Sequence, residues 1–133
     1  MEGYGVNSRI VEEANANGAS VLLTCDNGIA AFEAIDEAKK LGMTVIVTDH
    51  HEVPFEEHDG KRTYLLPKAD AIVDPKQEDC AYPFKSLCGT GVAYQLMTLL
   101  FRRMKRTMSR QEIFLRRLLL WLMLWSLSVK TVF

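Results

Sequence analysis

The sequence has few of the features that mark secreted, zinc-binding or membrane-spanning proteins. Its three cysteines, Cys25, Cys80 and Cys88, form no CxxC pair, which fits neither a disulfide framework nor a cysteine-rich zinc site. The apolar run at residues 118–125 is far shorter than the roughly 20 residues that a membrane helix requires. We therefore expect a protein of the reducing cytoplasm, with no membrane partner.

Acidic residues are nearly absent from the last part of the chain. Residues 1–101 carry eight Lys and Arg against sixteen Asp and Glu, whereas residues 102–133 carry eight basic residues against Glu112 alone. A basic segment beside an acidic body is compatible with a nucleic-acid surface and also with a solvated helix face. The charge distribution leaves both interpretations open.

The middle of the chain predicts an α/β fold. With 133 residues, 48% of them hydrophobic, the chain is long enough for one modest core. Two short apolar runs, 21–25 and 44–48, predict parallel strands, the first of them buried on both faces. Apolar residues recur at helical spacing between Ile29 and Gly42, which predicts an amphipathic helix. A strand, helix and strand in this order require a parallel crossover.

Turn and capping residues place the other elements. Asn7 or Ser8 is suited to cap a first helix that ends near Gly18. Two prolines, a glycine and many charges predict a loop over residues 52–68. The short apolar run 71–73, closed by an Asp-Pro pair, predicts a third strand. Apolar residues at helical spacing after the Gly89–Gly91 turn predict a last helix over about residues 92–104.

The pattern changes from residue 110. Residues 118–125 are apolar on every side, without an amphipathic period. We expect residues 1–109 to form the α/β domain. Residues 110–133 are expected to be an aberrant apolar segment, either a wholly buried helix or a foreign terminus such as a shifted reading frame would produce.

Polar residues follow the first two predicted strands. Asp26 ends one strand, and Asp49, His50 and His51 end the next. Because parallel strands deliver their carboxyl ends to one edge of a sheet, Asp26 and His50 should be neighbours. A carboxylate and an imidazole suit Mn²⁺ or a similar ion better than zinc. The same residues are also good turn and surface residues, so the pattern alone leaves a metal site and a purely structural role open.

The motifs resemble those of a known family. Asp49-His50-His51 after an apolar strand is the signature that names the DHH phosphoesterases, and Thr24-Cys25-Asp26-Asn27-Gly28-Ile29 resembles the aspartate motif that precedes it. Residues 2–7 and 82–94 look like the family's single-stranded-DNA exonucleases rather than its pyrophosphatases or nanoRNases. The resemblance covers about residues 2–104 and implies a three-layer domain with a parallel sheet.

The resemblance also implies roles for individual residues. Asp26 would be a metal-bridging carboxylate and His50 a metal ligand, with Mn²⁺ or Mg²⁺ as the cofactor. His51 would sit beside the scissile phosphate, and Asp49 would orient the histidines. The implied reaction is two-metal hydrolysis of phosphodiester bonds, which releases nucleotides from the 5′ end of single-stranded DNA during repair and recombination.

The sequence also departs from this family. The first aspartate motif of the family would lie upstream of Met1. Its last metal-binding aspartate has no counterpart, since residues 113–133 contain no Asp. We therefore expect a domain that is incomplete at both ends, inactive as this chain, and prone to self-association through exposed sheet edges.

Two glycines suggest a nucleic-acid contact. Gly89 and Gly91, ahead of a helix, could offer N–H groups to a phosphate, although close packing explains them as well.

Two other functions are alternatives to the single-stranded-DNA exonuclease. One is a DHH phosphodiesterase acting on short oligonucleotides or cyclic dinucleotides. The other is a non-catalytic α/β binding module, in which Asp26 and His50 only satisfy turns.

Overall fold

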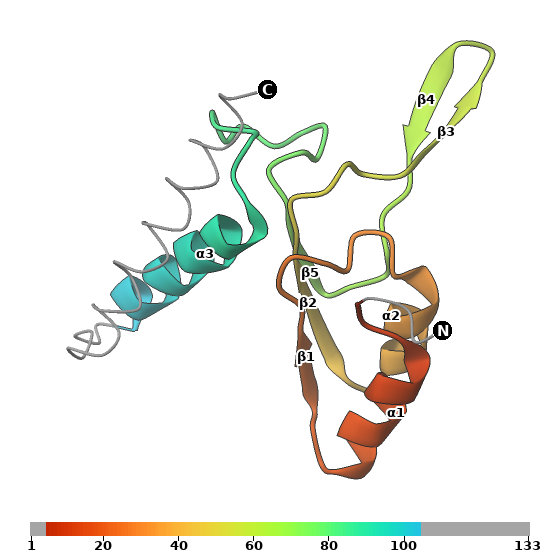
Figure 1. Ribbon diagram of the computed structural model, residues 1–133, viewed down its shortest axis with the longest axis vertical. Coiled ribbons are helices and arrows are strands. Elements are labelled where there is room, and N and C mark those ends of the chain that lie inside the picture. The colour runs from red at the N-terminus through yellow and green to blue at the C-terminus, as the bar shows by residue number, and fades with distance from the viewer. Residues whose placement is uncertain (1–4, 105–133) are drawn as a thin grey trace, which may run out of the picture.

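The computed structural model describes residues 5–104 of the chain (Figure 1). The expectations for residues 110–133, and the motif residues before Gly5, lie outside these residues. The elements follow in this order: α1 (Ser8–Ala16), β1 (Val21–Leu23), α2 (Phe32–Lys40), β2 (Thr44–Thr48), β3 (Phe55–His58), β4 (Lys61–Tyr64), β5 (Ala71–Val73) and α3 (Gly89–Arg103). No helix in this part of the chain has the length and apolar character to cross a membrane.

Three of the strands form a parallel sheet in the order β1-β2-β5. Val21 pairs with Thr44 at the start of the first ladder, and Thr48 pairs with Val73 at the end of the second. The central strand is β2, so its carboxyl end lies between those of its two neighbours. The predicted α/β class and the two predicted strands that flank α2 are confirmed.

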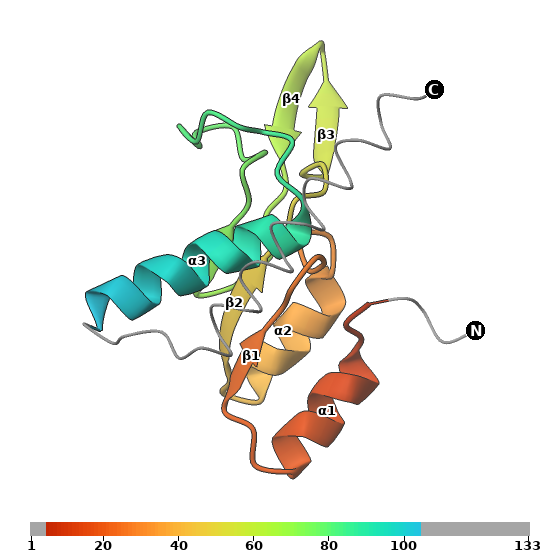
Figure 2. The ribbon, with the colours of Figure 1, turned by 60° about the vertical axis from the view of Figure 1, so that its left-hand side comes forward.

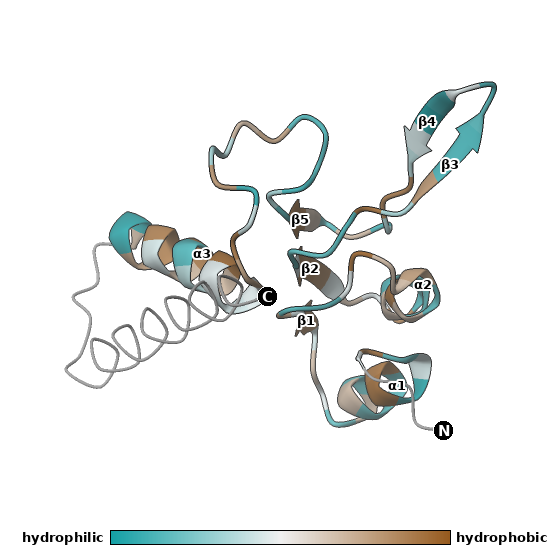
Figure 3. Cartoon of the chain, turned by 45° about the horizontal axis from the view of Figure 1, so that its top comes forward, coloured by the Kyte–Doolittle hydropathy of each residue, from teal (hydrophilic) through white to brown (hydrophobic). Residues whose placement is uncertain are grey.

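The helices cover the sheet from both sides. Helices α1 and α2 lie together on one side and α3 lies on the other, which gives the three layers that the family resemblance implied (Figures 2 and 3). Side chains of α1, α2 and β2 make a continuous core with Met43 at the turn between α2 and β2. Its fully buried members are Val11, Ile35, Ala38, Met43, Val45 and Val47.

The first helix begins and ends for local reasons, whereas the end of the second is held by a residue far along the chain. The side chain of Asn7 accepts the N–H of Ile10 at 3.0 Å, so Asn7 is the cap of α1, and Gly18 follows the helix with φ 88°. At the end of α2, the Lys39 ammonium contacts the Asp70 carboxylate at 2.7 Å. Asp70 also accepts the N–H of Val45 at 2.7 Å. These contacts tie α2 to the segment before β5.

The prediction that the first strand is buried on both faces is wrong. Val21 and Leu23 are 55% and 51% exposed. In the described part of the chain, β1 is an edge strand of the sheet. Leu22 of β1 packs against the core that α1, α2 and β2 form, whereas α3 contacts the central strand β2. An apolar sequence run could not reveal that the second face is only partly covered.

The prediction of a loop at residues 52–68 is also wrong. Strands β3 and β4 form an antiparallel hairpin that stands away from the sheet (Figure 1). Its turn residues Asp59 and Gly60 have φ values of 52° and 74°, as a tight two-residue hairpin turn requires. The Arg62 guanidinium lies 4.6 Å from the centre of the Phe55 ring. The Asp-Gly pair was the available signal, and the many charges around it obscured the strands.

Helix α3 begins three residues earlier than predicted. Cys88 is its cap in an extended conformation, and Gly89 is the first helical residue, so Gly89–Gly91 form the first turn of the helix and no separate turn. Gly89 and Gly91 are both buried there. Glycine is unfavourable inside a helix because of its backbone freedom, which is why the sequence indicated a turn. Close packing against the end of β1 accounts for Gly89.

Candidate metal centre

The end of β1 holds Asp26 in an unusual backbone conformation. Beyond Leu23 the pairing with β2 continues, since Thr24 N–H donates to Ile46 O at 3.0 Å and Asp26 N–H donates to Thr48 O at 3.1 Å. Asp26 itself has φ 64°, in the left-handed region that few residues other than glycine adopt. Such strain persists only where the surrounding structure holds it, and it is common at functional sites.

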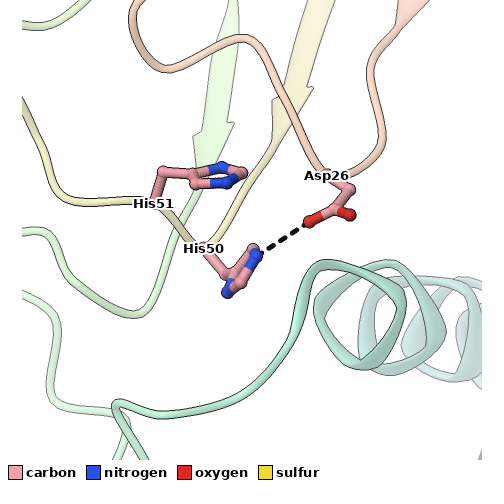
Figure 4. Close-up of side chains that lie close together, drawn as sticks. All are labelled: Asp26, His50 and His51. Carbon is pink, nitrogen blue, oxygen red and sulfur yellow. Dashed lines mark ion pairs between the residues drawn. The ribbon is translucent and has the colours of Figure 1, made fainter. Parts of the chain in front are cut away.

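The end of β2 supplies the histidines. His50 Nε2 lies 2.8 Å from Asp26 Oδ1. One potential ligand atom from each of Asp26, His50 and His51 lies within 4.8 Å of the others (Figure 4). The two imidazole rings are 4.5 Å apart at their centroids. The structure thus brings together the residues that the sequence placed at one edge of the sheet.

Asp49 lies beneath this cluster as a buried acceptor. Its Oδ2 accepts Ile29 N–H at 2.9 Å, and its Oδ1 accepts His50 N–H at 2.8 Å. Oδ1 also lies 2.6 Å from His51 Nδ1. Burial would raise the pKa of Asp49, but these hydrogen bonds outweigh it and hold the pKa below its usual value. The Asp49 carboxylate can accept a hydrogen bond only from an N–H group, so His51 donates through Nδ1, and Nε2 is the ring nitrogen that Asp49 does not engage.

Gly89 brings the start of α3 against Asp26. A Cβ atom at Gly89 would overlap the Asp26 side chain, its carboxylate included, so only glycine allows this contact. Cys88 makes no side-chain capping hydrogen bond, and the first turn of α3 contains no acidic residue. Because Gly89 is the first residue of α3 and lies against Asp26, the positive end of the helix dipole lies beside the cluster. The structure gives Gly91 a buried position in the same turn.

The donors in this cluster fit a divalent cation. One carboxylate and two imidazoles converge, which suits manganese and similar ions, and magnesium through the carboxylate. Within residues 5–104 this is the only such group of three or more acidic, histidine or cysteine side chains. Two metal ions in one site need more ligands than these three side chains supply.

Sequence reasoning missed Asp74, which follows β5. Asp74 is 2% exposed, and Oδ1 accepts Lys76 N–H at 2.8 Å. Its Oδ2 is buried without a partner among the described residues. Burial and the nearby Asp49 charge raise the pKa of Asp74, although Lys76 and the charge of His50 oppose this. Asp74 directly follows β5, which is parallel to β2, so it lies at the same edge of the sheet as Asp26 and His50.

Comparison with known proteins identifies the family. The family described as "DHH family, N-terminal domain" matches residues 3–124, and the chain therefore belongs to it. The resemblance drawn from the motifs is confirmed.

Several relatives carry the same name. The chain is 44% identical over 96 residues to the single-stranded-DNA-specific exonuclease RecJ of Escherichia coli strain K12. It is 47% identical over 95 residues to the Bacillus subtilis strain 168 protein of that name. These matches cover 72% and 71% of this chain, but only 15% and 11% of the relatives.

Proposed function

We propose that this chain is part of the catalytic domain of a RecJ-like exonuclease, which hydrolyses phosphodiester bonds of single-stranded DNA with two divalent metal ions. Its direction would be 5′ to 3′ and its role DNA repair and recombination. The observation that carries the proposal is the convergence of Asp26, His50 and His51, in a chain 44% identical to an exonuclease named for single-stranded DNA.

Each residue of the cluster has a proposed role. Asp26 and His50 hold Mn²⁺ or Mg²⁺, and His51 lies beside the scissile phosphate. A bound divalent ion would supply a hydroxide nucleophile and neutralise charge on the phosphoryl oxygens. Asp49 fixes the orientation of His51 through the 2.6 Å contact with Nδ1, so that Nε2 is the nitrogen available to the substrate.

The start of α3 is the proposed contact for the DNA backbone. Gly89 lies against Asp26, and the side chain of the cap residue Cys88 makes no hydrogen bond to the first N–H groups of the helix. Free N–H groups at a helix start bind anions, phosphate included. Gly89 and Gly91 would therefore offer backbone N–H groups to a phosphate of the strand.

This chain by itself should bind metal weakly and leave DNA uncut. The described residues contain three converging ligand side chains, too few for two metal ions. The chain also spans about 15% of the length of the Escherichia coli relative. We propose that the remaining ligands come from parts of the parent protein that have no counterpart among residues 5–104.

Two other functions give different results in simple assays. A DHH phosphodiesterase for short oligonucleotides or cyclic dinucleotides would favour dinucleotides over long single strands. A non-catalytic binding module would show no effect of His50→Ala on metal or nucleic-acid binding. The high identity to RecJ proteins supports the exonuclease over both.

The proposal includes the location of the protein in the cell. We propose a cytoplasmic location, which fits free cysteines at positions 25, 80 and 88.

We also propose that the chain self-associates through β1, because this strand is unpaired on one edge in the described part of the chain and exposes Val21 and Leu23.

Calorimetric titration with Mn²⁺ tests the metal site. The wild-type chain should bind Mn²⁺ weakly, and Asp26→Ala should abolish the binding. Glu12→Ala, which removes an exposed carboxylate from α1, should bind like wild type. The same samples are then incubated with single-stranded DNA. Cleavage by the wild type would contradict the proposed inactivity, and equal Mn²⁺ binding by Asp26→Ala would contradict the metal site.

A further inference from the structure

A cleft lies beside one strand of the hairpin. It has a volume of about 530 Å³, within the roughly 300–1,000 Å³ that ligand pockets occupy. All four residues of β4 line it, together with Val53, Leu66 and the segment 77–79, whereas no residue of β3 does. Successive residues of a strand point to opposite faces, so a cleft lined by all of β4 and none of β3 lies at the edge of β4 that faces away from β3.

The backbone of β4 is unpaired on this edge. Within residues 5–104, β4 pairs with β3 alone. Directly opposite residues of an antiparallel pair alternate between those that exchange hydrogen bonds and those that do not. Leu65 N–H donates to Pro54 O at 2.7 Å, so the next pair along the hairpin, Tyr64 with Phe55, is not hydrogen-bonded. By the same alternation, the N–H and C=O groups of Tyr64 and Arg62 point away from β3, toward the cleft.

Unpaired carboxylates face β4 across the cleft. Glu78 and Asp79 are both exposed, and neither has an ion pair with another described residue. On the opposite wall, the Arg62 guanidinium is already held by Glu57 at 3.0 Å. Lys61 remains as the basic lining residue without an ion pair in the described part of the chain. Two unpaired carboxylates therefore face one unpaired ammonium group, and a basic ligand complements this cleft.

We propose that the edge of β4 binds an extended segment of a partner protein, which adds a third strand to the hairpin and brings a lysine or arginine side chain near Glu78 and Asp79. An added strand lies about 4.8 Å from its neighbour, where its main-chain groups pair with the free groups of Arg62 and Tyr64. The side chains of Tyr64 and Leu66, 37% and 47% exposed, offer apolar contact at the same place. Single-stranded DNA fits less well, because its phosphates would meet the two carboxylates.

Matched peptides test the backbone edge. The probe is a short fluorescein-labelled peptide of alternating threonine and lysine, and its match carries a methyl group on every backbone nitrogen. The methylated peptide keeps the charge but cannot donate backbone hydrogen bonds, so it should bind at least about tenfold more weakly in fluorescence anisotropy. In the isotope-labelled wild-type chain, the amide NMR signals of Arg62 and Tyr64 should shift on peptide binding, and their hydrogen exchange should slow.

Matched charge variants test the opposite wall. Glu78→Gln combined with Asp79→Asn should weaken binding of the unmethylated peptide about fivefold. Glu12→Gln combined with Glu13→Gln removes the same charge from exposed positions of α1 and should leave the affinity unchanged. Should the cleft variant not fold, the two peptides on the wild type still decide, because that change is made in the ligand.

Several results would overturn the inference. Equal affinity for the two peptides, or no binding of either, would show that the backbone edge is not used. Equal losses in the two charge variants would mean attraction by the overall charge alone. Peptide-induced shifts at Val21 and Leu23 in place of Arg62 and Tyr64 would put the peptide on β1. Displacement of the peptide by an oligothymidylate would make nucleic acid the occupant, and shifts of Arg62 and Tyr64 with protein concentration alone would make it a second copy.

Discussion

Asp49 and His51 are in contact at 2.6 Å although their exposure differs greatly: the Asp49 side chain is 1% exposed and that of His51 is 58% exposed. A buried carboxylate thus holds an exposed ring. Because Asp49 also accepts N–H groups from Ile29 and His50, its position is set by the backbone of two segments. The orientation of His51 is therefore decided by the interior of the domain.

Asp49→Asn should destabilise the fold and free the His51 ring. Both carboxylate oxygens accept N–H donors, so either orientation of the amide sets its NH₂ group against a donor. We expect a loss of about 1–3 kcal/mol in the free energy of unfolding at neutral pH, measured by urea denaturation. NMR of the imidazole nitrogens should show that His51 no longer favours the Nδ1–H tautomer.

The same substitution has a defined pH dependence. The folded-state pKa of Asp49 lies below its ordinary value of 3.8, so its contribution is present above 3.8 and is lost as pH falls through the lowered pKa. The difference between wild type and Asp49→Asn should therefore shrink below pH 3.8. Glu12→Gln, an exposed change on α1, should unfold like wild type at neutral pH. A difference that grows in acid would contradict the assigned direction.

Asp74→Asn should stabilise the chain at neutral pH. Burial and the Asp49 charge raise the pKa of Asp74, so its contribution is complete below the ordinary value of 3.8 and is lost as pH rises through the raised pKa. Asparagine resembles the neutral acid and avoids this loss. We expect a gain of about 1 kcal/mol, which appears as pH rises above 3.8.

Asp70→Asn is the matched comparison for Asp74→Asn. The Asp70 carboxylate contacts Lys39, whose hydrogen bond lowers the pKa of Asp70, and it accepts Val45 N–H. The same change should therefore give no gain there. Lower stability of Asp74→Asn at neutral pH would mean that the fold needs an anion at Asp74.

Gly89→Ala should destabilise the chain because of Asp26. Alanine is the better helix former by about 1 kcal/mol, so the substitution by itself favours α3. A Cβ atom would nevertheless overlap the Asp26 side chain. In an Asp26→Gly background, which removes that side chain and relieves the positive φ, Gly89→Ala should become neutral or stabilising. A double-mutant cycle by urea denaturation measures the coupling, and additive effects would show that the two residues do not interact.

Leu23→Lys should reduce self-association. Leu23 is exposed on β1, and a lysine on an edge strand opposes pairing with another chain because the charge must stay hydrated. Light scattering should show a smaller average mass for the variant than for wild type at equal concentration. A monodisperse wild-type monomer would contradict the proposed association.

Much of the framework could be predicted from local sequence. Apolar runs and helical spacing fixed α2, β2 and β5, since burial requires these periods whatever the rest of the chain does. Because parallel strands end at one edge of a sheet, the sequence alone predicts that Asp26 lies next to His50. The Asn7 cap and Gly18 likewise set the ends of α1 through contacts within a few residues.

The tertiary structure decided what depends on distant neighbours. Only packing shows that Gly89 is a helical residue pressed against Asp26, because the reason for the glycine lies more than sixty residues away in the chain. The exposure of β1 likewise depends on which segments pack beside it. So does the lack of a hydrogen-bond partner, among the described residues, for the buried Oδ1 of Asn27 and Oδ2 of Asp74. Sequence alone determined which groups reach the edge of the sheet, and three-dimensional packing determined which of them are buried, bonded or left free.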